Sequence, residues 1–154
     1  MGWKQSAAVA ILFVTAVLLI SFQLPGLVLD RVAGVNAINP PIARAAIFAT
    51  MVIDILIVAP ICVASARMIR RGWAGGRDLT LISGGVVVGI YLMWLGTSLW
   101  MWCKNLKIEG IDSSSVLFVA YNSLFVILGF FILVSGLVIH LMKITWRLQH
   151  LKVG

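Results

Sequence analysis

One acidic residue stands out because it lies inside a long apolar run. Asp54 is near the midpoint of residues 42–66, and it alone interrupts the apolar stretch 52–58. A carboxylate in such surroundings is costly unless it is protonated, paired or hydrated. It could serve as a proton or cation site, with Pro60 loosening the helix nearby. We favour a protonated acid that forms a hydrogen bond with another chain or with a neighbouring helix, at Thr15, Asn122 or Ser135.

Further polar side chains are expected at similar depth. Trp94 lies well inside residues 79–102, where its N–H needs an acceptor or a helix–helix contact. Tyr121 and Asn122 belong to the first part of residues 115–142, and Gln23 to the last part of residues 7–29. We group Asp54, Asn122 and Trp94 as the candidate intramembrane polar site. Side chains of this kind usually form interhelical hydrogen bonds, although they can also line a pocket or bind a quinone headgroup.

Histidine is a common axial ligand of haem iron, which draws attention to His140. The other histidine, His150, follows ten residues later on the same predicted helix, so the two cannot hold one haem from opposite faces. A single axial ligand, or a haem shared between subunits, stays as an alternative. Spacings of 3, 4 and 3 residues place four side chains on one stripe: His140, Lys143, Arg147 and His150. This basic stripe, continuing into an amphipathic tail over residues 143–154, is expected to contact lipid headgroups or a partner.

Known catalytic signatures are missing from the sequence. Gly75-Gly76 is not followed by the Gly-Lys-Ser/Thr of a phosphate-binding loop, and there is no Cys-x-x-Cys motif. The two cysteines, Cys62 and Cys103, are predicted to lie too far apart for a disulfide. With two histidines and five acidic residues in all, the chain has little from which to build an active site. We therefore predict neither an enzyme nor a metal site.

The elements that must position these residues are four long apolar runs. Hydrophobic residues make up 62% of the 154 residues and charged residues 11%, against about 45–50% and 25% in soluble domains. The runs span residues 7–29, 42–66, 79–102 and 115–142, and each is long enough to cross a hydrocarbon core about 30 Å thick. The prediction is an all-α integral membrane protein. Its single domain, residues 1–154, would be a compact bundle of two helical hairpins, with the last helix extending past the membrane.

The net charge of +7 is unevenly distributed between the predicted loops. Eight basic residues and Asp78 lie on the side that holds both termini, whereas four basic and three acidic residues lie on the other. Because cytoplasmic loops carry the lysine and arginine excess, both termini are expected in the cytoplasm. The basic balance thus indicates topology and lipid contact, and we predict no nucleic-acid partner. The plasma membrane of a prokaryote is expected, since no Asn-x-Ser/Thr acceptor and no cleavable leader are recognisable.

Small residues recur at helical spacing on the third run. Gly85, Gly89 and Gly96 form a strip that would allow close approach of another helix, and Gly129 with Gly136 could do the same on the fourth run. Such strips support packing, within the chain or against another subunit.

The leading prediction is therefore a non-catalytic accessory subunit of a larger membrane complex, such as a respiratory or other energy-converting assembly. Its partners would be membrane lipids and either other membrane subunits or further copies of itself. The first alternative is a homo-oligomeric channel or small transporter that uses Asp54. The second is a redox subunit that binds quinone or haem, although no cofactor is predicted.

Overall fold

Every element in the described part of the chain is a helix. A computed structural model describes residues 3–32, 48–103 and 116–151. Its elements are α1 (Trp3–Val32), the π-helical turn η1 (Asp54–Val58), α3 (Ala59–Arg70), α4 (Gly75–Cys103) and α5 (Val116–Leu151). Residues 48–53 are also helical and lead into η1, which makes Phe48–Arg70 one continuous helix. The predicted all-α class is confirmed for these residues.

In the described part of the chain, four helices are long and apolar enough to cross a membrane, as the four apolar runs predict. Their apolar spans are Trp3–Leu24, Phe48–Arg70, Gly75–Trp100 and Val119–Met142. Spans of 22 to 26 residues measure about 33–39 Å at the α-helical rise. Each can therefore cross the hydrocarbon core with a moderate tilt.

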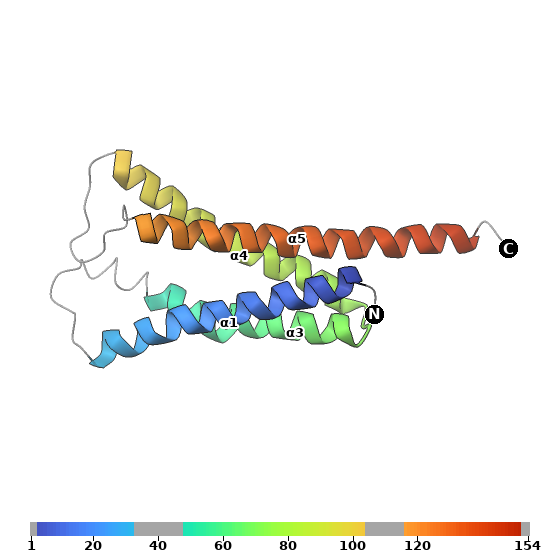
Figure 1. The fold of residues 1–154 in the computed structure, drawn as a ribbon, viewed down its shortest axis with the longest axis horizontal. Coiled ribbons are helices and arrows are strands. Elements are labelled where there is room, and N and C mark those ends of the chain that lie inside the picture. Colours follow the sequence, from blue (N-terminus) through green and yellow to red (C-terminus); the bar gives the residue numbers. More distant parts are fainter. Residues whose placement is uncertain (1–2, 33–47, 104–115, 152–154) are drawn as a thin grey trace.

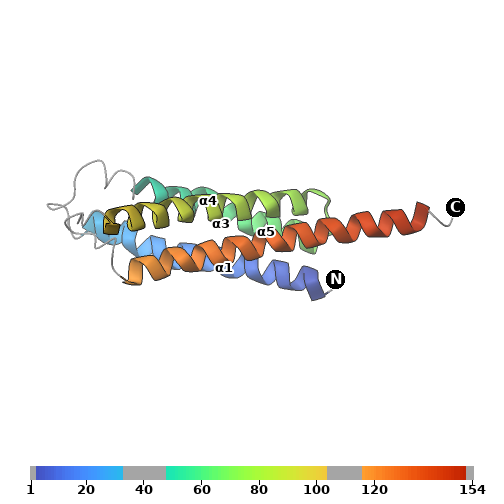
Figure 2. The same cartoon turned by 90° about the horizontal axis from the view of Figure 1, so that it is seen from above.

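The helices form two antiparallel hairpins that pack side by side (Figures 1 and 2). Around the bundle, α1 contacts α3, α3 contacts α4, α4 contacts α5, and α5 returns to α1. The start of α1 and the turn between α3 and α4 lie at the same end, and α5 projects beyond that end (Figure 1). All four helices thus border one central core.

The ends of the helices differ from the predicted boundaries by a few residues. The first helix begins at Trp3 rather than at residue 7, and α4 begins at Gly75 rather than at residue 79. The second ends at Arg70 instead of residue 66, and residues 42–47 lie outside the described part. Polar residues at these ends extend the helices by about one turn. The predicted boundaries exclude them because they were drawn from the apolar runs alone. The last helix continues unbroken to Leu151, in agreement with a helical tail.

Gly72 closes α3 and allows the tight turn into α4. Its φ of 71° lies in the left-handed region, which glycine adopts without steric cost. The Gly72 N–H donates to the Ile69 carbonyl at 3.0 Å, and the Trp73 N–H donates to the Met68 carbonyl at 2.9 Å. These two bonds form a Schellman cap that satisfies the last carbonyls of the helix.

The glycines that bring α4 and α5 together are not those of the predicted strip. A Cβ added at Gly84 would lie 2.8 Å from the Leu133 backbone nitrogen, and one at Gly129 would lie 2.9 Å from the Val88 nitrogen. Gly136 packs similarly on Leu81, so both glycines expected to pack on the fourth run, Gly129 and Gly136, approach α4 closely. By contrast, a Cβ at the three glycines of the strip would meet no described atom within 4 Å: Gly85, Gly89 and Gly96. Within the chain, close packing therefore uses a different face of α4.

We expect Gly129→Ala to destabilise the bundle and Gly89→Ala to leave it unchanged or slightly more stable. The new methyl at residue 129 overpacks against the Val88 backbone, at a cost of about 1–3 kcal/mol. At residue 89 only the helix propensity changes, in favour of alanine by about 1 kcal/mol. Thermal unfolding of the detergent-solubilised variants, followed by circular dichroism, measures both effects. Equal melting temperatures for the two variants would contradict this assignment of the packing face.

Candidate functional site

Asp54 lies at the first residue of a π-helical turn and has no exposed surface. The turn is closed by the Ala59 N–H, which donates to the Asp54 carbonyl five residues back. Pro60 follows at once, and it has no N–H to donate and a ring that would clash with the carbonyl four residues earlier. The wider turn removes that conflict. Such π-turns are frequent at functional sites.

The Asp54 carboxyl group is held by donors from two other helices. Its Oδ2 accepts a hydrogen bond from Gln23 Nε2 of α1 at 2.9 Å and another from Tyr91 Oη of α4 at 2.8 Å. Its Oδ1 has no hydrogen-bond partner among the described residues. Asp54 therefore joins three helices at one oxygen atom.

These donors differ from the predicted partners of Asp54. The expected bond to a neighbouring helix is present, but Gln23 and Tyr91 form it in place of Thr15, Asn122 or Ser135. Thr15 instead donates to the Ile11 carbonyl of its own helix at 2.8 Å. Sequence reasoning missed Tyr91 altogether. A tyrosine in the middle of an apolar helix, far from either end, was the available signal, since a buried hydroxyl requires a partner.

A second tyrosine extends the cluster to α5. Gln23 Nε2 also donates to Tyr121 Oη at 2.7 Å, and the hydroxyl oxygens of Tyr91 and Tyr121 lie 3.4 Å apart. The Tyr91 ring stacks on Phe125 with centroids 4.6 Å apart. The rings of Phe22 and Tyr121 form a T-shaped contact with centroids 5.5 Å apart. We call Gln23, Asp54, Tyr91 and Tyr121 the polar cluster; it fixes the relative positions of all four helices.

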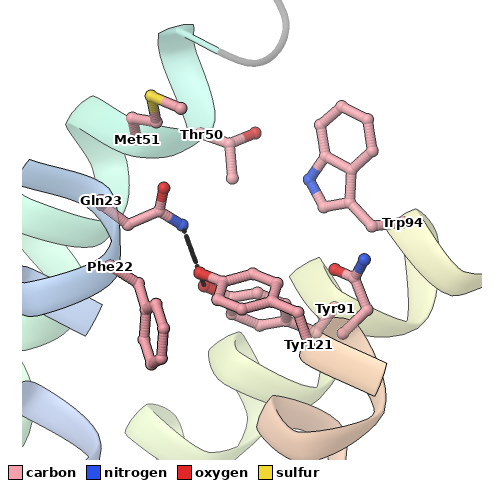
Figure 3. Close-up of a pocket in the computed structure, with 8 residues that line it drawn as sticks. Phe22, Gln23, Thr50, Met51, Tyr91, Trp94 and Tyr121 are labelled. Atoms are coloured by element: carbon pink, nitrogen blue, oxygen red, sulfur yellow. Dashed lines mark hydrogen bonds between the residues drawn. The ribbon is translucent and has the colours of Figure 1, made fainter. Parts of the chain in front are cut away.

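A cavity of about 300 Å³ lies directly beside the polar cluster (Figure 3). Its lining comes from all four helices: Phe22, Gln23, Thr50, Met51, Tyr91, Trp94, Tyr121 and Asn122. None of these side chains is charged, and Asp54 lies behind Gln23 and Tyr91 rather than on the wall. The structure thus brings the predicted residues Trp94 and Asn122 to one cavity. Two other residues of its lining, Gln23 and Tyr91, each form a hydrogen bond with Asp54.

A smaller polar contact joins α3 to α4 further along the bundle. The hydroxyl oxygens of Ser65 and Ser83 lie 3.1 Å apart, and each also lies within hydrogen-bond distance of a carbonyl of its own helix, so that each of the two protons has an acceptor. Both side chains are buried. Because every donor there has a partner, this pair is a packing feature rather than a site.

The structure describes the side chain of only one residue of the predicted basic stripe, His140. His140 is half-buried, and its Nδ1 has no partner among the described residues. The side chains of Lys143, Arg147 and His150 lie outside the described part, although their backbone is helical. The stripe therefore stays a prediction. A second cavity nearby, of about 350 Å³, has Arg77 as its charged lining residue, and Arg77 is ion-paired with Asp78.

Known proteins add no assignment to this geometry. No family model, no curated protein and no solved structure matches the chain. In the described residues, no group of three or more histidine, cysteine or acidic side chains is placed to hold a metal ion. The polar cluster and its cavity therefore carry the functional argument by themselves.

We expect Tyr91→Phe to destabilise the bundle by about 0.5–1.5 kcal/mol, the net value of one hydrogen bond. Because Tyr91 donates to Asp54, this loss should shrink toward zero in an Asp54→Ala background. Reversible unfolding in detergent and denaturant gives the four free energies of this double-mutant cycle. Additive losses, with no coupling between the two positions, would show that the Tyr91–Asp54 bond contributes nothing.

Proposed function

We propose that the chain is an integral membrane protein. The four helices of spanning length support insertion, and so does their outward surface. Leu56, Ile127 and Leu137 each leave more than half of their surface exposed, at 67%, 53% and 51%. An apolar surface of this extent is unfavourable in water, whereas lipid tails solvate it without cost.

Both termini are proposed to lie on the cytoplasmic side of a prokaryotic plasma membrane. Five described basic residues and one acidic residue, Asp78, gather at the end of the bundle where α1 and α4 begin and α3 ends. The basic residues are Lys4, Arg67, Arg70, Arg71 and Arg77. Cytoplasmic loops carry such an excess of lysine and arginine. The far end of α4, at Cys103, is then on the outer side.

Cys103 offers a direct test of this orientation. It is exposed, whereas Cys62 is fully buried. We expect a membrane-impermeant maleimide to label the protein in intact spheroplasts, and to leave the Cys103→Ser variant unlabelled. Labelling found only in inverted membrane vesicles would reverse the proposed topology.

Within the membrane, the chain is proposed to act as a non-catalytic accessory subunit of a larger complex. The observation that supports this is the outward strip of Gly85, Gly89 and Gly96 on α4. All three are exposed, and a Cβ at each would meet no atom of the described residues within 4 Å. Spacings of four and seven residues keep them on one face of the helix.

The three glycines of the strip lower the stability of α4, and packing within the chain does not offset that loss. Each glycine lowers helix stability by about 1 kcal/mol relative to alanine. At Gly84 and Gly129 that cost is offset by close packing of α4 on α5, but the strip faces away from α5. Small residues let another transmembrane helix approach its backbone, where van der Waals packing drives association. A helix of another subunit, or of a second copy, would recover the cost in this way.

The Asp54 carboxyl group does not support the accessory role. A buried acid without hydrogen-bond donors in its own chain would have favoured a second subunit, but Gln23 and Tyr91 of the same chain donate to Asp54. The same geometry keeps the alternative of a homo-oligomeric channel or small transporter, since Oδ1 remains without a described partner beside a π-turn. The support for the accessory role therefore comes from the glycine strip and not from the acid.

Extraction in native lipid discs tests the accessory role. We expect larger membrane subunits to co-purify in fixed stoichiometry, and Gly89→Leu to lower their recovery about fivefold or more, because the side chain separates the helices. Ala10→Leu, an equally exposed substitution on α1, should leave recovery unchanged.

Two outcomes would contradict the accessory role. A chain that is monodisperse without any partner in native discs would remove it. A homo-oligomer whose ion or substrate flux in liposomes is abolished by Asp54→Asn would establish the transporter instead.

A further inference from the structure

We propose that the cavity beside the polar cluster binds the ring of a lipid-soluble quinone, a flat ring that carries carbonyl oxygens and an apolar tail. This goes beyond the accessory role and does not depend on it. The argument rests on the lining of the cavity, on the hydrogen bonds within the polar cluster and on the lack of charge among the described lining residues.

The cavity has the size and lining of a small-molecule site. Its volume of about 300 Å³ is at the lower end of the range for ligand pockets, about 300–1,000 Å³, which is enough for one ring. Phe22, Met51 and Trp94 supply apolar and aromatic surface, and the polar side chains converge from the other walls (Figure 3). A flat apolar ring with a few polar atoms matches that distribution.

The polar cluster directs one donor toward the cavity. The hydroxyl proton of Tyr91 is committed to Asp54 Oδ2, and Gln23 Nε2 donates to Asp54 and to Tyr121. Tyr121 Oη is therefore an acceptor toward Gln23, and its own proton is available to another group. A carbonyl oxygen in the cavity is a stronger acceptor than Tyr91 Oη, which lies 3.4 Å away.

The same arrangement leaves one acceptor at the cavity. Gln23 directs its nitrogen at the tyrosines and its carbonyl oxygen to the opposite side (Figure 3). Tyr121 can thus donate to the carbonyl of a quinone, and Gln23 Oε1 can accept from the hydroxyl of the reduced quinol. A site with both groups can bind either form of the ring.

The absence of a counter-charge argues against an organic cation as the ligand. A cation that leaves water for a membrane-buried site needs a partner of opposite charge. Asp54, which would have to neutralise the charge, has no exposed surface. The described residues that line the cavity are all uncharged. A neutral ligand is therefore favoured.

Titration of the purified full-length protein with decylubiquinone tests the proposal, with tryptophan fluorescence as the readout. We expect saturable quenching that is largely lost in Trp94→Phe and retained in Trp100→Phe, since Trp100 does not line the cavity. Tyr121→Phe should weaken binding about twofold to tenfold, as one hydrogen bond predicts. Thr97→Val is the matched control, because that hydroxyl donates to the Met93 carbonyl on an exposed face of α4.

A second variant keeps the test independent of the tyrosine. Met51→Trp should fill the cavity and abolish saturable quenching, while circular dichroism and elution volume report that the bundle is intact. Quenching that rises linearly with quinone, equally in all variants, would overturn the proposal. Saturable binding of tetraphenylphosphonium that is lost in Asp54→Asn would overturn it in favour of a cation site.

Discussion

The carboxyl group of Asp54 is the constraint on which the centre of this bundle depends. Removing a carboxyl group from water is costly unless hydrogen bonds replace the lost solvent, and Asp54 has no exposed surface. Gln23 and Tyr91 supply those bonds from α1 and α4. Since an acceptor with two donors fixes both of their positions, the acid determines how the two hairpins face one another. The Gln23–Tyr121 bond then carries the same constraint to α5.

Apolar packing alone would not specify that arrangement. In lipid, helices gain nothing from hiding apolar side chains from each other, so their relative rotation is set by small residues and polar contacts. In this chain the small residues and the polar contacts act at different helix interfaces. Gly84 and Gly129 set the close approach of α4 and α5, whereas the polar cluster sets the relation between the hairpins. The outward strip of Gly85, Gly89 and Gly96 takes part in neither, and the proposal of a partner helix rests on that difference.

Much of the fold was predictable from the sequence, and the pairing of its polar groups was not. Apolar runs of spanning length identify the four helices and the all-α class, and a lone acid inside one run identifies Asp54. Which face of a helix meets its neighbour depends on rotation, and Gly84 and Gly85 differ by about 100° around α4. The regular spacing of Gly85, Gly89 and Gly96 in the sequence therefore indicated the outer strip, and not Gly84, as the packing face. Tyr91 was missed because a single aromatic residue leaves an apolar run unbroken.

The cavity follows from the same constraint. Side chains that serve a buried acid must turn their donors inward, so their remaining polar atoms face the opposite way. Gln23 directs Nε2 at Asp54 and Tyr121, which leaves its carbonyl oxygen pointing away from the tyrosines (Figure 3). Asp54 thereby presets a donor and an acceptor on a wall that it does not itself form. Because such preorganisation removes part of the entropic cost of binding, the acid can shape ligand recognition without touching the ligand.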